Sequence, residues 1–187
     1  MTEPLLLVVD LECTCSDEST PASERVSPEQ MEIIEIGAVV ATLQGTVVDQ
    51  FTHFVQASER PALTAFCSSL TGLQQADVNA ADFLDDVLGA LDHWLEPNRS
   101  RLVGWGSWGA FDQRQLDREC VRKGLRNPLT SLPHTNLKAH FAKRRRIRQV
   151  GMAKALEIVG LPLLGQHHRG LDDARNIAQL LHYTVDA

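Results

Sequence analysis

Features that would identify several common protein classes are missing from this sequence. Its 4 cysteines form no CxxC pair and have no histidines at zinc-finger spacing, so we expect reduced thiols and no zinc finger. The aliphatic run near the N-terminus follows Glu3 and ends at Asp10, which fits neither a signal peptide nor a membrane span. The chain has no internal repeat or low-complexity segment. These absences predict a soluble, cytoplasmic protein.

An excess of positive charge is also missing. The chain carries 18 Lys and Arg residues against 24 Asp and Glu residues, for a formal net charge of -6. A protein that coats nucleic acid through bulk charge needs the opposite balance. Any nucleic-acid partner must therefore be bound through a local basic patch or through bound cations. One such patch exists, in the segment AKRRRIRQ at 142–149.

The hydrophobic residues that are present predict one folded unit. A length of 187 residues with 43% hydrophobic content suffices for one core, so we expect a single domain over 1–187. Periodicity predicts strands, a hairpin turning near Gln44, a polar surface loop over 16–30, and several amphipathic helices. This order of elements indicates an α/β fold with a mixed sheet. The strands are expected at 5–9, 32–43, 46–55 and 101–106, and the helices at 80–95, 110–124, 136–144, 151–160 and 171–185.

Acidic residues stand at the end of the first strand. Asp10 and Glu12 follow five aliphatic residues, and residues two apart in a strand point to the same face. Two carboxylates on one face of a buried strand repel each other, and burial penalises the charge of both. A positive charge is therefore expected between them.

Further acidic residues stand where helices are expected to begin. Asp112 follows the strand at 101–106, and Asp172 and Asp173 begin the last helix. Site residues of α/β proteins gather at such positions. The same residues could instead cap these helices or complement their dipoles. Taken one by one, these residues leave both interpretations open.

Several segments, in order along the chain, resemble the motifs of one enzyme family. They are VDLECTC, EIIEIGAV, FCSSLTGL, SWGAFD and HHRGLDDARNIAQLL. Together they resemble the DEDDh family of 3′-to-5′ exonucleases, and specifically its Eri-type exoribonuclease branch. The resemblance implies that the acidic residues that name the family are Asp10, Glu12, Asp112 and Asp173, and that its histidine is His168.

The register of the last motif has an alternative. His168 precedes Asp173 with four residues between them, as in the family, while His167 has the same spacing to Asp172. Asp173 is followed by Ala-Arg-Asn, as the family motif is. We therefore prefer His168 with Asp173.

The resemblance implies a fold and a chemistry. The fold would be a ribonuclease H-like mixed sheet flanked by helices. The activity would be 3′-to-5′ exoribonuclease cleavage that releases nucleoside 5′-monophosphates, with His168 as general base and Glu12 among the catalytic residues. Two Mg²⁺ ions, for which Mn²⁺ substitutes, would bind the four carboxylates and supply the expected positive charge.

Substrate contacts are predicted less directly. The segment FCSSLTGL resembles the lining of the pocket for the 3′-terminal nucleotide, so base or sugar contacts are expected from Phe66, Leu70 and Thr71. Phe111 and Trp108 flank Asp112 and could form walls of the site. Each of these residues could equally serve core packing.

The basic run has two interpretations as well. A solvated face is the ordinary one, but an implied nucleic-acid substrate makes phosphate contacts plausible along the incoming strand. The residues concerned are Lys143, Arg144, Arg145, Arg146 and Arg148. The expected partner is an RNA 3′ end, with no membrane and no deducible protein partner.

Alternatives to the exoribonuclease remain open at this stage. One is the same chemistry on DNA, because a 2′-hydroxyl contact cannot be recognised from sequence. Another is a catalytically silent module that binds RNA ends. Some Eri-type proteins add an N-terminal nucleic-acid-binding module, which we do not expect here because the first strand begins at Leu5. The loop at 16–30 adjoins Glu12 and could shape access.

Overall fold

A five-stranded sheet organises the computed structural model, which describes residues 3–185. The strand order is β3-β2-β1-β4-β5, so the first strand lies at the centre. β1 and β2 pair antiparallel, as do β2 and β3, whereas β4 runs parallel to β1, and β5 runs parallel to β4. The predicted mixed sheet and hairpin are confirmed. The strands span Leu5–Cys13 (β1), Ile33–Thr42 (β2), Val47–Phe54 (β3), Leu102–Ser107 (β4) and His134–Asn136 (β5).

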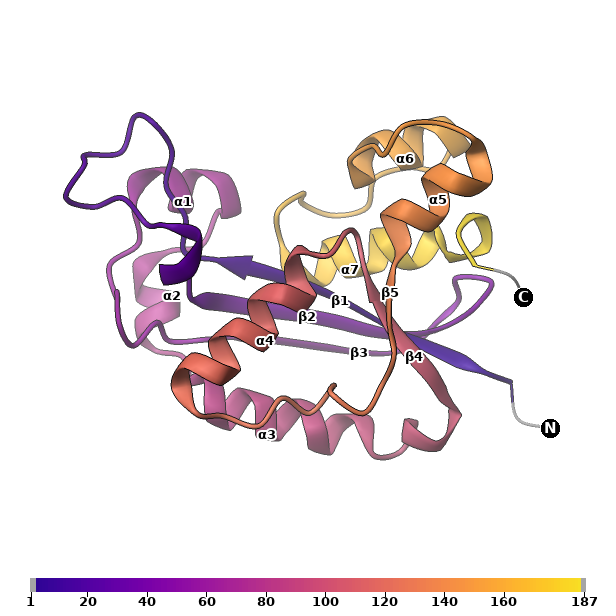
Figure 1. Ribbon diagram of the computed structural model, residues 1–187, viewed down its shortest axis with the longest axis horizontal. Coiled ribbons are helices and arrows are strands. Elements are labelled where there is room, and N and C mark those ends of the chain that lie inside the picture. The colour runs from indigo at the N-terminus through magenta and orange to yellow at the C-terminus, as the bar shows by residue number, and fades with distance from the viewer. Residues whose placement is uncertain (1–2, 186–187) are drawn as a thin grey trace.

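Helices cover both faces of the sheet (Figure 1). α3 and α4 pack on one face, and α5, α6 and α7 pack on the other, while α1 and α2 close one end. The α-helices span Ala65–Thr71 (α1), Gln75–Asn79 (α2), Leu84–Leu95 (α3), Phe111–Lys123 (α4), Leu137–Arg145 (α5), Met152–Val159 (α6) and Gly170–Gln179 (α7). Short 3-10 helices span Pro28–Gln30 (η1), Arg99–Arg101 (η2) and Leu181–Tyr183 (η3).

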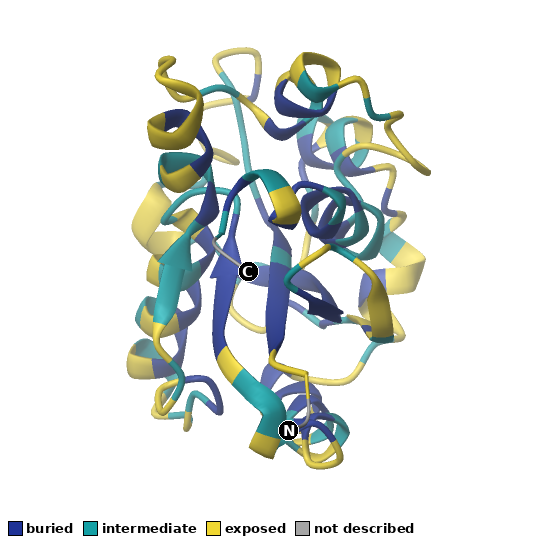
Figure 2. Cartoon of the chain, turned by 90° about the vertical axis from the view of Figure 1, so that its right-hand side faces the viewer, coloured by how far each residue is buried: buried dark blue, intermediate teal, exposed yellow. Residues whose placement is uncertain are grey.

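β1 is buried on both faces because helices pack against each of them (Figure 2). Its odd-numbered residues, including Leu7 and Val9, join the core beneath α3 and α4. Its even-numbered residues Leu6 and Val8 join the core beneath α5, α6 and α7. Each face is therefore apolar until Val9, and the face toward α7 then changes to Asp10 and Glu12.

The structure corrects some predicted boundaries. The helix expected from Ala80 begins at Leu84, because Phe83 pairs with Gln56 in a parallel bridge and lies 51% exposed. The last helix ends at Gln179, after which the chain continues as η3. The sequence analysis did not anticipate α1, α2 and β5, which are short.

No helix within residues 3–185 is both long enough and apolar enough to cross a membrane.

Candidate active site

Three acidic side chains meet where β1 ends. Ligand oxygens of Asp10, Glu12 and Asp173 all lie within 4.8 Å of one another. Asp10 and Glu12 come from the face of β1 that turns toward α7, and Asp173 lies in the first turn of α7. The alternation of a strand and the start of a distant helix thus create one acidic group. We call these three residues the site cluster.

A contact between two glycines positions α7 against the sheet. Gly37 lies on β2 directly opposite Asp10. A Cβ atom on Gly37 would lie 1.9 Å from the backbone carbon of Gly170, and one on Gly170 would lie 2.8 Å from the Gly37 nitrogen. Such distances are far below van der Waals contact, so neither position accepts a side chain. The start of α7 therefore lies close enough to β1 to place Asp173 in the cluster.

Asp10 and Glu12 of the site cluster lie close together without a basic partner. Burial raises the pKa of Asp10 well above its usual range, and the charges of Asp112 and Asp173 raise it further. Burial and the charge of Asp173 raise the pKa of Glu12 to about 8. Within residues 3–185, no Lys or Arg forms an ion pair with Asp10 or Glu12.

This electrostatic situation fits a divalent cation. Buried carboxylates are stable when they are paired or coordinate a metal, and otherwise they tend to take up protons. The donors here are all oxygens, which suit hard ions such as Mg²⁺ and Mn²⁺. The acidic cluster thus meets the chemical requirements of a divalent-metal site.

Asp112 lies beside the cluster in a different environment. Asp112 lies in the first turn of α4, and its Oδ1 accepts a hydrogen bond of 3.1 Å from the backbone N–H of Leu11 on β1. Burial raises its pKa to about 6, and this backbone hydrogen bond partly opposes the shift. Its charge raises the pKa of Asp10, so the two groups are electrostatically coupled. The N-cap position of α4 is Ala110, so Asp112 lies within the first turn and is not the N-cap residue.

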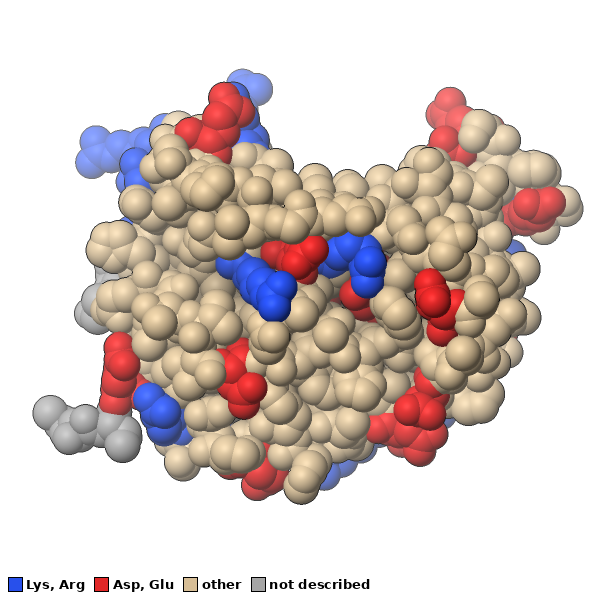
Figure 3. Space-filling model, turned by 180° about the vertical axis from the view of Figure 1, so that it is seen from behind, with Lys and Arg blue, Asp and Glu red and all other residues tan. Residues whose placement is uncertain are grey.

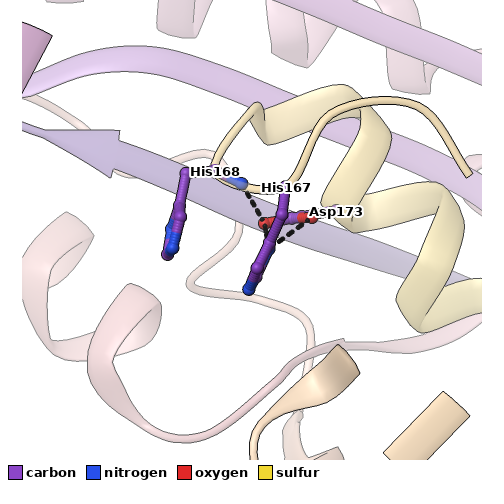
Figure 4. A group of neighbouring side chains, drawn as sticks. All are labelled: His167, His168 and Asp173. Carbon is purple, nitrogen blue, oxygen red and sulfur yellow. Dashed lines mark hydrogen bonds and ion pairs between the residues drawn. The ribbon is translucent and has the colours of Figure 1, made fainter. Parts of the chain in front are cut away.

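The two adjacent histidines contact Asp173 in different ways (Figure 4). His167 Nδ1 lies 2.9 Å from Asp173 Oδ2, whereas His168 donates its backbone N–H to the same oxygen over 3.0 Å. The two imidazole rings stack with centroids 4.0 Å apart. His168 has a left-handed backbone with φ of 64°, a conformation that is uncommon for residues other than glycine. Burial and the neighbouring His167 lower the pKa of His168, so its ring is neutral near pH 7.

An ion pair beside the cluster fixes the same loop to the sheet. Arg169 donates to both carboxylate oxygens of Glu35, at 3.1 and 3.3 Å, and Gly170 donates its backbone N–H to Glu35 over 3.3 Å. The guanidinium also lies 5.5 Å from the centre of the Phe54 ring. Glu35 is directly opposite Glu12 and is 1% exposed. Arg169 therefore neutralises this additional carboxylate and anchors the residues that follow His168.

The structure separates the predicted substrate contacts into two groups. Thr71 is fully buried and its hydroxyl bonds to backbone atoms of Cys67 and Leu73, which favours packing. The Trp108 indole donates to the Val150 carbonyl over 3.0 Å, which also favours a scaffold role. Phe66, Leu70 and Trp108 are partly exposed, and Phe111 is exposed.

The basic run lies at the end of α5 and in the loop that follows. Its residues Lys143, Arg144, Arg145, Arg146 and Arg148 are all exposed. The Arg145 guanidinium lies over the rings of Phe141 and Tyr183, at 5.8 and 5.1 Å. Figure 3 shows basic side chains gathered at one upper corner of the molecule, with acidic side chains among them, and further acidic side chains at the opposite upper corner.

Sequence reasoning missed the two features that position α7. Gly37 interrupts a strand of β-branched residues, and a glycine inside a strand signals a close approach of another backbone. Glu35 lies two residues before it and is charged within a buried strand, which requires a partner. Both signals were visible, but neither identifies α7 as the partner.

Comparison with known proteins agrees with this geometry. The exonuclease family model, RNase_T, matches residues 7–181. The chain is 30% identical to the 3′-5′ exonuclease Snipper of Drosophila melanogaster and 32% identical to ERI1 exoribonuclease 2 of Homo sapiens, each over 94% of its length. It spans 67% of the Drosophila protein and 27% of the human one.

A solved structure shows the same fold. The nuclease domain of 3′hExo, described as a DEDDh family member bound to rAMP, superposes with a TM-score of 0.83 at 26% sequence identity. The match covers 95% of this chain and 90% of that one. The predicted ribonuclease H-like architecture and the predicted family are both confirmed. The chain belongs to the exonuclease family, in its DEDDh group.

Proposed function

We propose that the chain is a Mg²⁺-dependent 3′-to-5′ exoribonuclease that releases nucleoside 5′-monophosphates. The observation that carries this proposal is the site cluster of Asp10, Glu12 and Asp173, in which neither Asp10 nor Glu12 has a basic partner. Asp112, coupled electrostatically to Asp10, completes the proposed metal ligands. Two bound ions would neutralise charge on the attacked phosphate and on the departing oxygen.

The chain's own residues supply a base and its orientation. An imidazole nitrogen of His168 accepts the proton of the attacking water, and its lowered pKa leaves the ring neutral for this role. The bond from its amide to Asp173 and the Arg169–Glu35 ion pair fix the segment that carries it. Proximity of the base to the acidic cluster is therefore a property of the folded chain.

Support for RNA as the substrate comes from related proteins. The human relative is named an exoribonuclease, and the solved DEDDh structure is described with rAMP. The exposed basic run gives this acidic protein a local surface that suits phosphates. Phe66 and Leu70 on α1 and Phe111 on α4 are available for stacking or sugar contacts.

Digestion of end-labelled oligonucleotides tests the proposal. RNA and DNA of the same sequence, labelled at the 5′ end, are incubated with Mg²⁺, Mn²⁺ or EDTA. We expect RNA to shorten stepwise from its 3′ end with either ion, and EDTA to stop the reaction. Faster loss of DNA would redirect the proposal to DNA, and binding of RNA ends without shortening under any condition would indicate a silent module. An Asp10→Asn protein purified in parallel controls for contaminating nucleases.

A further inference from the structure

Two histidines and an aspartate form a second group of potential metal ligands. Ligand atoms of His167, His168 and Asp173 all lie within 4.8 Å of one another. The rings are nearly parallel, with planes inclined by 15°, and His167 Nδ1 lies 2.9 Å from Asp173. Figure 4 shows the two rings side by side, with the His167 ring between the His168 ring and the carboxylate of Asp173. The three side chains are therefore neighbours in the folded chain, and one imidazole ring has to turn out of the stack for both nitrogens to face one ion.

Asp173 is shared between this group and the site cluster. The site cluster offers only oxygens, which suit Mg²⁺. The histidine group offers two nitrogens and one oxygen, a donor set that suits Zn²⁺ and other transition ions better than Mg²⁺. One carboxylate thus joins two donor sets with different preferences.

We propose that His167, His168 and Asp173 bind a divalent transition ion such as Zn²⁺, and that this ion inhibits the nuclease. An ion at this position occupies the lone pair with which His168 would accept a proton. It also engages Asp173, one of the proposed ligands of the catalytic ions. The inhibition rests on the proposed function, whereas the binding does not.

The environment of the group supports ion binding. Asp173 is 4% exposed and is oriented by the backbone N–H of His168, so the carboxylate is fixed in place. The His167 side chain is 41% exposed, which leaves a path from solvent. Neutral imidazole is a common nitrogen ligand of divalent transition ions. Without His167, only one imidazole and one carboxylate remain.

Calorimetric titration of Zn²⁺ into the full chain, in Mg²⁺ buffer without RNA, tests the binding. We expect one ion per chain with the native sequence, and a dissociation constant raised by about tenfold or more in His167→Ala. His93→Ala, which removes a histidine from α3, is the matched control and should bind as the native chain does. Equal affinity in the native and His167→Ala proteins would overturn the proposed site.

Activity gives the second measurement. Zn²⁺ is added to the Mg²⁺-activated proteins, and the remaining rate is expressed as a fraction of each protein's own rate without Zn²⁺. We expect strong inhibition of the native and His93→Ala proteins and resistance in His167→Ala. Equal inhibition of all three would place the ion at the carboxylates and overturn the inhibitory site. If no protein degrades RNA, the proposed function fails, and the titration still decides the binding.

Discussion

Two clusters of acidic side chains within residues 3–185 differ in whether a lysine lies between their carboxylates. The site cluster consists of Asp10, Glu12 and Asp173. The other, which we call the paired cluster, consists of Glu32, Glu119 and Lys123, where Lys123 Nζ lies 2.8 Å from an oxygen of each glutamate. Glu32 and Glu119 are fully buried, and in the site cluster Glu12 and Asp173 are buried while Asp10 is partly exposed.

Their electrostatics are opposite. Burial disfavours the charge of Glu32, yet hydrogen bonds from Lys123 and from backbone amides hold its pKa below the usual value. Burial raises the pKa of Glu12 to about 8, with no such compensation. Glu119 also accepts a backbone hydrogen bond of 2.8 Å from Ile33, so it fastens α4 to β2. Burial of a carboxylate therefore does not by itself indicate a functional site, whereas burial of a carboxylate without a basic partner does.

The largest effect is expected from removing a carboxylate from the site cluster. Asp10→Asn should reduce turnover below detection, because it removes a proposed metal ligand. The same change relieves repulsion, so the melting temperature of the metal-free protein should stay equal or rise. Oligonucleotide digestion and thermal unfolding in EDTA measure the two effects. Near-normal Mg²⁺-dependent turnover in this variant would contradict the assignment.

The next largest effect concerns the base. His168→Ala should lower kcat by about a hundredfold to ten-thousandfold, the usual contribution of a general base. The acid limb of the rate–pH profile should flatten, while Mg²⁺ affinity persists. His167→Ala should have a smaller effect, although its ring contacts Asp173. Reversed severity would mean that the register of the last motif is shifted by one residue.

The next prediction concerns the lysine of the paired cluster. Lys123→Met leaves Glu32 and Glu119 buried without a partner, which should lower the free energy of unfolding by about 3–5 kcal/mol. Denaturant unfolding measures this loss. Activity per folded molecule should persist, because the cluster lies outside the site. Lys123→Arg keeps the charge and serves as the control, and an unchanged stability in Lys123→Met would remove the proposed distinction between the clusters.

The raised pKa of Glu12 should make the stability of the metal-free protein depend on pH. In the metal-free protein the pKa of Glu12 is raised from 4.5 to about 8, so the unfolded chain loses this proton first as pH rises. The free energy of unfolding should therefore fall between about pH 4.5 and pH 8, by an amount on the order of a few kcal/mol. Melting temperatures across this range, in EDTA and in Mg²⁺, measure the effect.

Two controls isolate the contribution of Glu12 to this pH dependence. Mg²⁺ should restore stability at the alkaline end, and Glu12→Gln should reduce the slope in EDTA. Parallel curves for the native and Glu12→Gln proteins would show that Glu12 carries no such penalty.

The smallest expected effect concerns the basic run. Replacing Lys143, Arg146 and Arg148 with Gln should raise KM for long RNA severalfold and weaken its dependence on salt. Cleavage of a dinucleotide should remain nearly unchanged, since it does not reach α5. Arg126→Gln, which removes an exposed cation near the end of α4, is the control. Equal salt slopes in all three proteins would return the run to a solvated face.

The acidic end of β1 was predictable from sequence because it depends on local alternation. Asp10 and Glu12 are two residues apart in a strand, which predicts that they lie on the same face, and the structure confirms that geometry. The family motifs then predicted Asp173 as their partner. The assignment of metal and base roles to these residues remains a prediction.

The contacts that bring α7 to β1 were not predictable in the same way. Gly37 and Gly170 lie in segments far apart in the sequence, and their contact depends on tertiary packing. α1 and α2 contain 7 and 5 residues, too few for a helical period to stand out. The bridge from Phe83 to Gln56 similarly overrode a helical pattern that looked continuous in the sequence. For the glycine contact and for the bridge, the missing information was the pairing between distant segments.

The glycine contact also determines where homologous chains can change in length. A residue inserted between Gly170 and Asp173 would rotate the aspartate by about 100° around α7 and move it about 1.5 Å along the axis. Because each missing Cβ faces backbone, no second substitution can restore the contact. Insertions and deletions should therefore be confined to the exposed stretch from Gly160 to Gln166, ahead of the histidines. An alignment of relatives should show gaps there and a constant length from Gly170 to Asp173.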